Sequence, residues 1–145
     1  MSLNQTTNSI AKEFSVVIAD DDDITREMLR GLLRAAGFHV IGEASDGARA
    51  LDMYQKLKPQ ILCLDIEMPT MNGIETLKAV RKADTKTIVI MITGAATGDN
   101  VRAAIAEKAS GIIVKPFNTA KIITEIERAI VRQQAAIESA ATANK

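Results

Sequence analysis

The most constraining feature of this sequence is an apolar run that leads directly into four consecutive carboxylates. Residues 16–19 read Val-Val-Ile-Ala, and residues 20–23 are all aspartates. An apolar run placed before a helical pattern is typical of a buried strand in a parallel sheet, and such sheets bind ligands at the carboxyl ends of their strands. A loop that holds phosphate directly would be rich in glycine, because backbone N–H groups must approach the anion. The aspartates therefore predict a cation site, and any phosphoryl group would bind together with the cation.

Composition limits the class of protein. The chain has 145 residues, 47% of them hydrophobic and 25% charged, which predicts one globular domain with its own core. Eighteen basic and eighteen acidic residues cancel, so we expect no direct binding to nucleic acid or membranes. A single cysteine, Cys63, excludes an internal disulfide and is expected in the core. Without a signal sequence or an apolar run of about 20 residues, a cytoplasmic location is expected.

Hydrophobic periodicity predicts five strands that alternate with five helices. The strands are expected at residues 16–19, 40–43, 61–65, 87–93 and 111–115. The helices are expected from Ile24 to a stop at Gly37, from Ala48 to before Pro59, at 73–82, at 99–108, and from Asn118 or Thr119 to about Ser139. Residues 1–13 are expected to be a flexible segment, 14–132 the domain, and 133–145 a helical extension with a frayed tail.

The same periodicity predicts which side chains of each helix face the sheet. In the first, second and fourth helices these are Ile24, Met28, Leu29, Leu32 and Leu33; Ala48, Leu51, Tyr54 and Leu57; and Val101, Ala104 and Ile105. In the third and fifth they are Ile74, Leu77 and Val80, and Ile122, Ile126, Ala129 and Ile130.

The alternation indicates an α/β fold, a doubly wound five-stranded parallel sheet of the flavodoxin-like kind. Right-handed crossovers leave few topologies, and the common strand order is 2-1-3-4-5. That order places Asp20 and Asp21, after the first strand, beside Asp65 at the end of the third. Thr93 and Lys115 end the next two strands. We therefore expect these five polar side chains to meet at one edge of the sheet.

The chemistry of this group points to a hard metal ion and a phosphoryl group. Three carboxylates within about 5 Å of one another repel by roughly 3 kcal/mol per pair at an effective dielectric near 20, so they either raise a pKa or hold a cation. Oxygen ligands without histidine or a cysteine pair suit Mg²⁺ or Mn²⁺. The hydroxyl of Thr93 and the ammonium of Lys115 suit phosphoryl oxygens, and an aspartate can itself become an aspartyl phosphate.

Four motifs in order resemble the CheY-like receiver domains of two-component response regulators. They are Val-Ile-Ala-Asp20-Asp21, Leu-Asp65-Ile-Glu-Met68-Pro69-Thr-Met-Asn-Gly73, Thr93-Gly-Ala and Lys115-Pro116-Phe117, and the resemblance covers roughly residues 15–132. It implies that Asp65 is the phospho-acceptor, Asp21 a direct Mg²⁺ ligand and Asp20 a ligand mainly through water. It further implies that the backbone carbonyl of Glu67 completes the protein's ligands, that Thr93 and Lys115 hold the phosphoryl oxygens, and that the Lys115–Pro116 peptide is cis.

The resemblance also implies partners. The phosphoryl group would come from the phosphohistidine of a sensor histidine kinase or a phosphotransfer protein, with the receiver catalysing the transfer and its own dephosphorylation, although it is not a metabolic enzyme. Few residues follow the fifth helix, so we expect a stand-alone receiver whose output is a protein contact. The surface of the fourth helix, fifth strand and fifth helix is the expected site for a downstream protein, and Ile123 and Val131 leave a homodimer open.

Two positions depart from the family pattern, and two alternatives stay open. Ile112 stands where many relatives have a switch aromatic. Glu67, two residues after Asp65, is expected to overhang the phosphoryl site, to compete for the metal and to repel the phosphoryl group. Asp22 and Asp23 are expected to form a loop and a helix cap. The first alternative is a pseudo-receiver that binds partners without phosphorylation. The second is an aspartyl-phosphate hydrolase of another family, with Glu67 as its acid/base.

Overall fold

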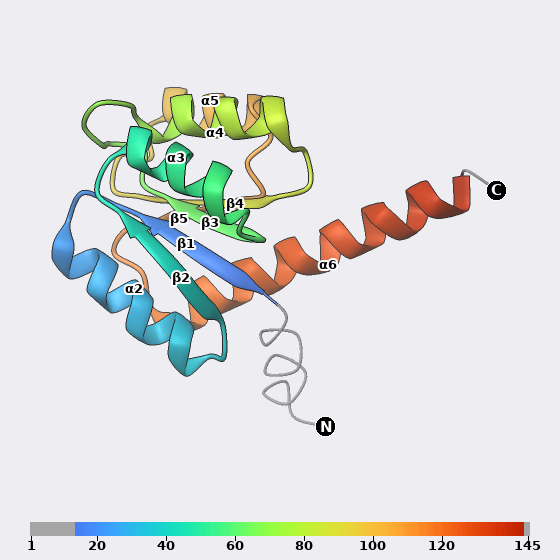
Figure 1. Ribbon diagram of the computed structural model, residues 1–145, viewed down its shortest axis with the longest axis horizontal. Coiled ribbons are helices and arrows are strands. Elements are labelled where there is room, and N and C mark those ends of the chain that lie inside the picture. Colours follow the sequence, from blue (N-terminus) through green and yellow to red (C-terminus); the bar gives the residue numbers. More distant parts are fainter. Residues whose placement is uncertain (1–13, 144–145) are drawn as a thin grey trace.

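The computed structural model describes residues 14–143, so the predicted flexible segment 1–13 and residues 144–145 lie outside the described residues. Its sheet has five parallel strands in the order β2-β1-β3-β4-β5, as predicted (Figure 1). The strands are β1 (Ser15–Ala19), β2 (His39–Ala44), β3 (Ile61–Leu64), β4 (Ile88–Thr93) and β5 (Gly111–Val114).

Five helices cover the two faces of this sheet. They are α2 (Asp23–Ala35), α3 (Gly47–Leu57), α4 (Gly73–Ala83), α5 (Gly98–Ala106) and α6 (Thr119–Ala143). Helices α2 and α6 lie on one face, and α3, α4 and α5 lie on the other (Figure 1). The predicted α/β doubly wound fold is therefore confirmed. None of the helices in residues 14–143 is long and apolar enough to cross a membrane.

Strand residues alternate between two separate cores, because successive side chains of a strand point to opposite faces. In β1, Val16 and Ile18 pack under α2 and α6, whereas Val17 and Ala19 pack under α3 to α5. Cys63 lies in the first core as predicted, and burial raises the pKa of its thiol to about 12. Both faces of the sheet are thus buried, which explains the continuous apolar runs in its strands.

Side-chain caps fix where the helices begin beside the sheet edge. Asp22 accepts a hydrogen bond from the backbone N–H of Thr25, so the predicted cap of the first helix is confirmed. Asn72 and Glu75 form a reciprocal capping box at the start of α4. The side chain of Asn118 accepts from the backbone N–H of Lys121 and caps α6. These caps determine how the loops that follow β1, β3 and β5 leave the sheet.

Several side chains predicted to face the sheet are exposed instead. Ile24 and Met28 of α2 are 67% and 55% exposed, Ile105 of α5 is 64% exposed, and both Ala48 and Leu57 of α3 are exposed. The helix arc that touches the sheet is narrower than the apolar arc in the sequence. In α3 the buried positions are Gly47, Ala50 and Tyr54, which place the contact face to one side of the predicted stripe.

Helix α6 continues past the end predicted for it. Residues 140–143 are helical, whereas fraying was expected after Ser139. Alanine is the strongest helix former, and this segment is rich in it, which explains the longer helix. In Figure 1 the C-terminal part of α6 extends beyond the sheet. The inward residues Ile122, Ile126, Ala129 and Ile130 are buried as predicted.

Candidate functional site

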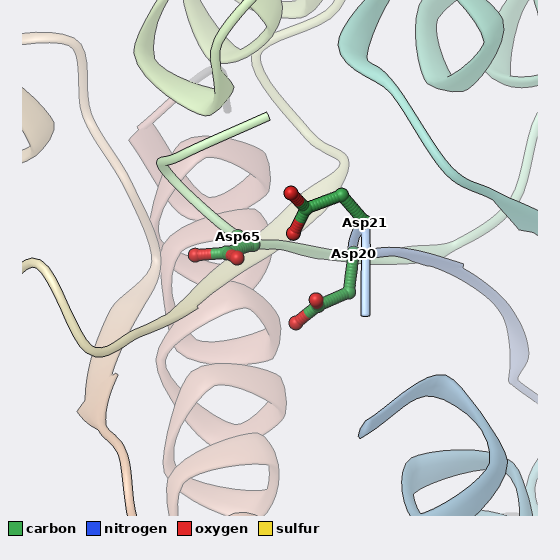
Figure 2. A group of neighbouring side chains, drawn as sticks. All are labelled: Asp20, Asp21 and Asp65. Atoms are coloured by element: carbon green, nitrogen blue, oxygen red, sulfur yellow. The ribbon is translucent and has the colours of Figure 1, made fainter. Parts of the chain in front are cut away.

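Three aspartates gather at the carboxyl ends of β1 and β3 (Figure 2). Carboxylate oxygens of Asp20, Asp21 and Asp65 all lie within 4.8 Å of one another. Asp20 is 1% exposed and Asp65 is 6% exposed, whereas Asp21 is exposed to solvent. The strand order therefore brings together the three carboxylates that the sequence predicted to meet.

The backbone of the sheet positions the two buried aspartates. The N–H of Asp20 donates to the carbonyl of Ala44 at 3.1 Å, and the N–H of Asp65 donates to the carbonyl of Ala19 at 2.9 Å. Both residues thus prolong the hydrogen bonding of the strands that precede them. Behind Asp65, a Cβ placed on Gly73 would lie 2.0 Å from the Asp65 carbonyl oxygen, so this close backbone approach requires glycine.

Lys115 lies between the two buried carboxylates. Its Nζ is 2.7 Å from an oxygen of Asp20 and 3.3 Å from an oxygen of Asp65. Burial alone would lower the pKa of Lys115, but its hydrogen bonds to the two aspartates raise the pKa above its ordinary value. The side chain therefore remains a cation at neutral pH. The Lys115–Pro116 peptide is cis, as the resemblance implied.

The carboxyl of Asp65 is held in an unfavourable environment for its charge. Burial raises the pKa of Asp65 above its ordinary value, and the negative charge of Asp20 acts in the same direction. The ammonium of Lys115 and the hydroxyl of Thr93 oppose this shift without cancelling it. Thr93 is itself fully buried at the end of β4. An added positive charge would stabilise the carboxylate form of Asp65.

Glu67 lies two residues beyond Asp65, and its side chain is exposed. Together with Asp21 and Asn72 it lines a hollow of about 590 Å³ that opens next to the aspartates. Glu67 and Asp21 therefore border the same open space. Ile112 is partly buried and packs against the core under α3 to α5, opposite Met91 in the β4–β5 pairing.

The structure also identifies two supporting residues that the sequence did not predict. The guanidinium of Arg26 donates to the Asp20 carbonyl at 2.6 Å, and it also pairs with Asp23. This carbonyl belongs to the peptide that joins Asp20 to Asp21, so Arg26 fixes the peptide between the two acids. Gly47 lies so close to the loop after β3 that a Cβ would be 1.9 Å from the Met71 carbonyl oxygen. An Asp-Gly pair before a helix is the only sequence feature that marks Gly47.

The donor set fits a hard divalent cation. Every ligand atom of the trio is a carboxylate oxygen, and one of the three acids is open to solvent, which leaves room for water and for a ligand oxygen. Beside it lie a buried hydroxyl and a lysine ammonium, the groups that suit a phosphoryl oxygen. The arrangement is able to hold Mg²⁺ and a phosphoryl group next to each other.

Comparison with known proteins gives a consistent result. Residues 16–127 match the family described as response regulator receiver domain. The chemotaxis protein CheY of Thermotoga maritima is 36% identical over 113 residues, which cover 78% of this chain and 94% of that protein. Among solved structures, a CheX-CheY-BeF3-Mg+2 complex from Borrelia burgdorferi matches with a TM-score of 0.75 and 33% identity, over 78% of this chain and 86% of that one. A CheY-like receiver domain protein from Methanospirillum hungatei has the same fold, with a TM-score of 0.80 at 24% identity, over 85% of this chain and 98% of that one.

Proposed function

The chain belongs to the response regulator receiver domain family of two-component signalling, and from this premise we propose that Asp65 accepts a phosphoryl group from a phosphohistidine. The donor is a sensor histidine kinase or a phosphotransfer protein. The observation that supports this assignment best is the position of the Asp65 carboxylate, which is nearly buried, lies beside two further acids and contacts Lys115. Asp20 shares these neighbours, and Asp65 is distinguished from it by the resemblance of its motif to the family and by the hydroxyl of Thr93, which hydrogen-bonds to the Asp65 carboxyl.

The nucleophile of the proposed transfer is the carboxylate of Asp65, which is mostly shielded from water but still reachable from solvent. An oxygen of Asp65 attacks the phosphorus of the phosphohistidine, a P–O bond forms, and the P–N bond to the imidazole breaks as the ring nitrogen takes the electron pair. The ammonium of Lys115 is charged and lies 3.3 Å from Asp65, so it is placed to pair with a phosphoryl oxygen. The hydroxyl of Thr93 is placed to donate to a second phosphoryl oxygen.

The metal site of this proposal consists of Asp21 as a direct ligand, Asp20 acting mainly through water, Asp65 and the backbone carbonyl of Glu67. Bound Mg²⁺ or Mn²⁺ would neutralise charge on the transferring phosphoryl oxygens. Receiver domains bind Mg²⁺ through acidic residues, and the all-oxygen trio of this chain fits that ion. Arg26 holds the Asp20–Asp21 peptide in place through its hydrogen bond to the Asp20 carbonyl.

The test is intact mass after incubation with Mg²⁺ and acetyl phosphate, compared between the parent protein and Asp65→Asn. We expect a gain of one phosphoryl group in the parent that needs Mg²⁺ and is absent from Asp65→Asn. Asp52→Asn is the matched control, because it makes the same chemical change on an exposed aspartate of α3 outside the trio. It should be phosphorylated like the parent.

Failure of the parent to gain mass, together with failure to bind beryllofluoride, would contradict the proposal. The chain would then be a pseudo-receiver that contacts its partners without phosphorylation. Phosphorylation that persists in Asp65→Asn would instead mean that another residue is the acceptor. The hydrolase alternative predicts repeated turnover of a small phosphate ester, so a separate incubation with p-nitrophenyl phosphate and Mg²⁺ tests it, and released nitrophenol would favour the hydrolase.

The output of the proposed switch is a protein contact on the surface of α5, β5 and α6. Ile105, Val114 and Val131 on these elements are 64%, 44% and 58% exposed, which supports an apolar contact there with a downstream protein or a second copy. Ile112 of β5 is the proposed link, because it reaches from this surface toward the core next to β4. Backbone amide shifts of these elements on adding beryllofluoride and Mg²⁺ test the link, and shifts confined to the loops around Asp65 would contradict it.

A further inference from the structure

A second cavity lies at the other end of the sheet, where β4 and β5 begin. It has a volume of about 480 Å³ and is bounded by α6, by the loop before β4 and by the turn between α5 and β5. Four cationic side chains line it: Arg81 of α4, Lys86 of the loop, Lys108 of the turn and Arg132 of α6. The lining contains no carboxylate among the described residues. We call this cavity the basal groove.

The floor of the basal groove is fixed by hydrogen bonds that meet at Ser110. The backbone N–H of Ser110 donates to the Val89 carbonyl at 2.7 Å, and the N–H of Val89 donates to the Ser110 hydroxyl at 2.9 Å. Arg81 donates to the same hydroxyl at 3.2 Å, and Arg132 donates to the Ser110 carbonyl at 2.8 Å. Two guanidinium groups are therefore held around one serine without any ligand.

The hydroxyl of Ser110 still has a hydrogen that it can donate. A hydroxyl has two acceptor lone pairs and one donor hydrogen. Val89 and Arg81 use the acceptor positions, so the hydroxyl can still donate its hydrogen to a group in the groove. A carboxylate in the groove could accept this hydrogen and pair with Arg81 and Arg132. The two guanidinium groups and this hydroxyl donor together suit an anionic group at the polar end of the groove.

The opposite wall of the basal groove is apolar and belongs to the overhanging part of α6. Ala136, Ile137 and Ala140 line it, and Ile137 is 50% exposed. Gln133 donates to the Lys86 carbonyl, which attaches this part of α6 to the loop before β4. Glu138, the acidic residue of this stretch, lines a separate hollow with Ala135, Ser139 and Thr142. The groove therefore presents cations around Ser110 and an uncharged apolar ledge along α6 beyond Arg132.

We propose that the basal groove binds an acidic, apolar peptide segment of a partner protein. A carboxylate of the segment is bound by Ser110, Arg81 and Arg132, and an apolar side chain packs against Ile137 and its neighbours. The four cations come from four separate elements, which suits several carboxylates along a chain better than a single anion. The ledge continues along α6 toward Ala140, as a linear ligand requires.

This site is independent of the phosphoryl chemistry at Asp65, so it is tested on the unphosphorylated full chain. The probe is a synthetic helix-forming peptide with leucines along one face and glutamates beside them, titrated into ¹⁵N-labelled protein. We expect backbone amide shifts at Lys86, Lys108, Ser110 and Ile137. One control peptide replaces each glutamate by lysine and a second replaces each leucine by serine, and neither should produce these shifts.

Variants of exposed residues test the charge and the apolar ledge separately. Lys86→Glu combined with Lys108→Glu should lower the affinity for the acidic peptide by roughly tenfold or more. Ile137→Ser should lower this affinity several-fold. Lys121→Glu makes the same charge change at an exposed lysine outside the groove and should leave binding unchanged.

Four outcomes would overturn the proposal. They are the absence of shifts at the groove, equal shifts with the lysine peptide, unchanged binding in the double variant, and binding of free benzoate at the groove without binding of the peptide. The last would assign the groove to a small organic acid.

Discussion

The charged side chains at the two ends of the sheet have opposite signs and opposite effects on the stability of the fold. At the carboxyl ends of the strands, three carboxylates crowd within 4.8 Å and Lys115 is the cation that contacts two of them. At the amino ends, the partly buried Arg81 donates to the backbone carbonyls of Thr87 and Lys108 and to the Ser110 hydroxyl. Charge at the first end opposes folding, whereas charge at the second end stabilises the loops that it touches.

The difference shows what each end is built for. Repulsion among the aspartates is relieved when a cation binds, so the acidic end keeps free energy available for a ligand. Arg81 satisfies backbone carbonyls that would otherwise lack partners, so its charge supports the fold even without a ligand. The four predictions that follow test this contrast, beginning with the change expected to be largest.

Gly73→Ala should disrupt the acidic end most strongly. The new Cβ would lie 2.0 Å from the Asp65 carbonyl oxygen, which forces the loop after β3 away from the sheet. We expect the free energy of unfolding to fall by about 3 kcal/mol or more, as for other severe steric changes. Gly31→Ala in α2 is the matched control, because nothing lies within 4 Å of its added Cβ. It should be neutral or stabilise by about 0.5–1 kcal/mol. Urea denaturation measures both, and equal effects would contradict the close approach.

Arg81→Gln should destabilise the basal end by about 2–3 kcal/mol, because it removes charged hydrogen bonds to several loop carbonyls. Lys82→Gln, at the exposed neighbouring position, should change stability by less than about 0.5 kcal/mol. Urea denaturation compares the two variants. A neutral Arg81→Gln would mean that this charge does not support the fold.

Asp65→Asn should stabilise the metal-free protein at neutral pH. The pKa of Asp65 is raised in the folded state, so its ionised form costs stability once the pH is above that pKa. Two carboxylates at this separation repel by roughly 3 kcal/mol at an effective dielectric near 20, and Lys115 offsets part of that, so we expect a gain of about 1–2 kcal/mol.

The gain from Asp65→Asn should shrink as the pH falls through the folded pKa of Asp65 and vanish below about pH 4, where the carboxyl is protonated in both states. Thermal denaturation in chelator across this range measures it. Asp23→Asn, at an exposed aspartate, should show no such gain. Destabilisation at neutral pH would mean that the ion pair with Lys115 outweighs the repulsion.

Glu67→Gln should have the smallest effect, and it should change the binding of metal and phosphoryl group without changing the stability of the fold. Its exposed carboxylate lines the same hollow as Asp21, so removing the charge should change Mg²⁺ affinity and the lifetime of the aspartyl phosphate by a factor of roughly 2–5, as expected for one exposed charge. Calorimetry and decay of the phosphorylated mass measure the two quantities. Glu27→Gln, on the exposed side of α2, is the control. Unchanged values for Glu67→Gln would mean that its side chain points away from the site.

The acidic end was predictable because its residues follow strands that topology brings together. The apolar run before Asp20, the run before Asp65 and the alternation of elements define the strand order, and the strand order defines the meeting point. Exposure of Ile24, Met28 and Ile105 was not predictable from periodicity. An apolar residue on a helix signals a contact only if the helix is oriented toward the sheet at that position.

The basal groove illustrates the other limit of sequence reasoning. Arg81 and Lys86 are near each other in the chain, whereas Lys108 and Arg132 lie much further along it, and the overall charge is zero. A sum over the sequence hides a separation of charge that exists only in the folded molecule. Arg26 was missed for a related reason, because its partner is a backbone carbonyl and no side-chain pattern marks such a contact.

The position of Lys115 also affects how the protein folds in the absence of a metal ion. Its ammonium already pairs with Asp20 and Asp65, so the newly made chain has an internal counter-ion for its most crowded acids. Small zinc domains, in contrast, stay unfolded until their ion is supplied. Folding of this protein therefore need not wait for magnesium, and under the proposed function the concentration of free Mg²⁺ would set its readiness to be phosphorylated and not the amount of folded protein.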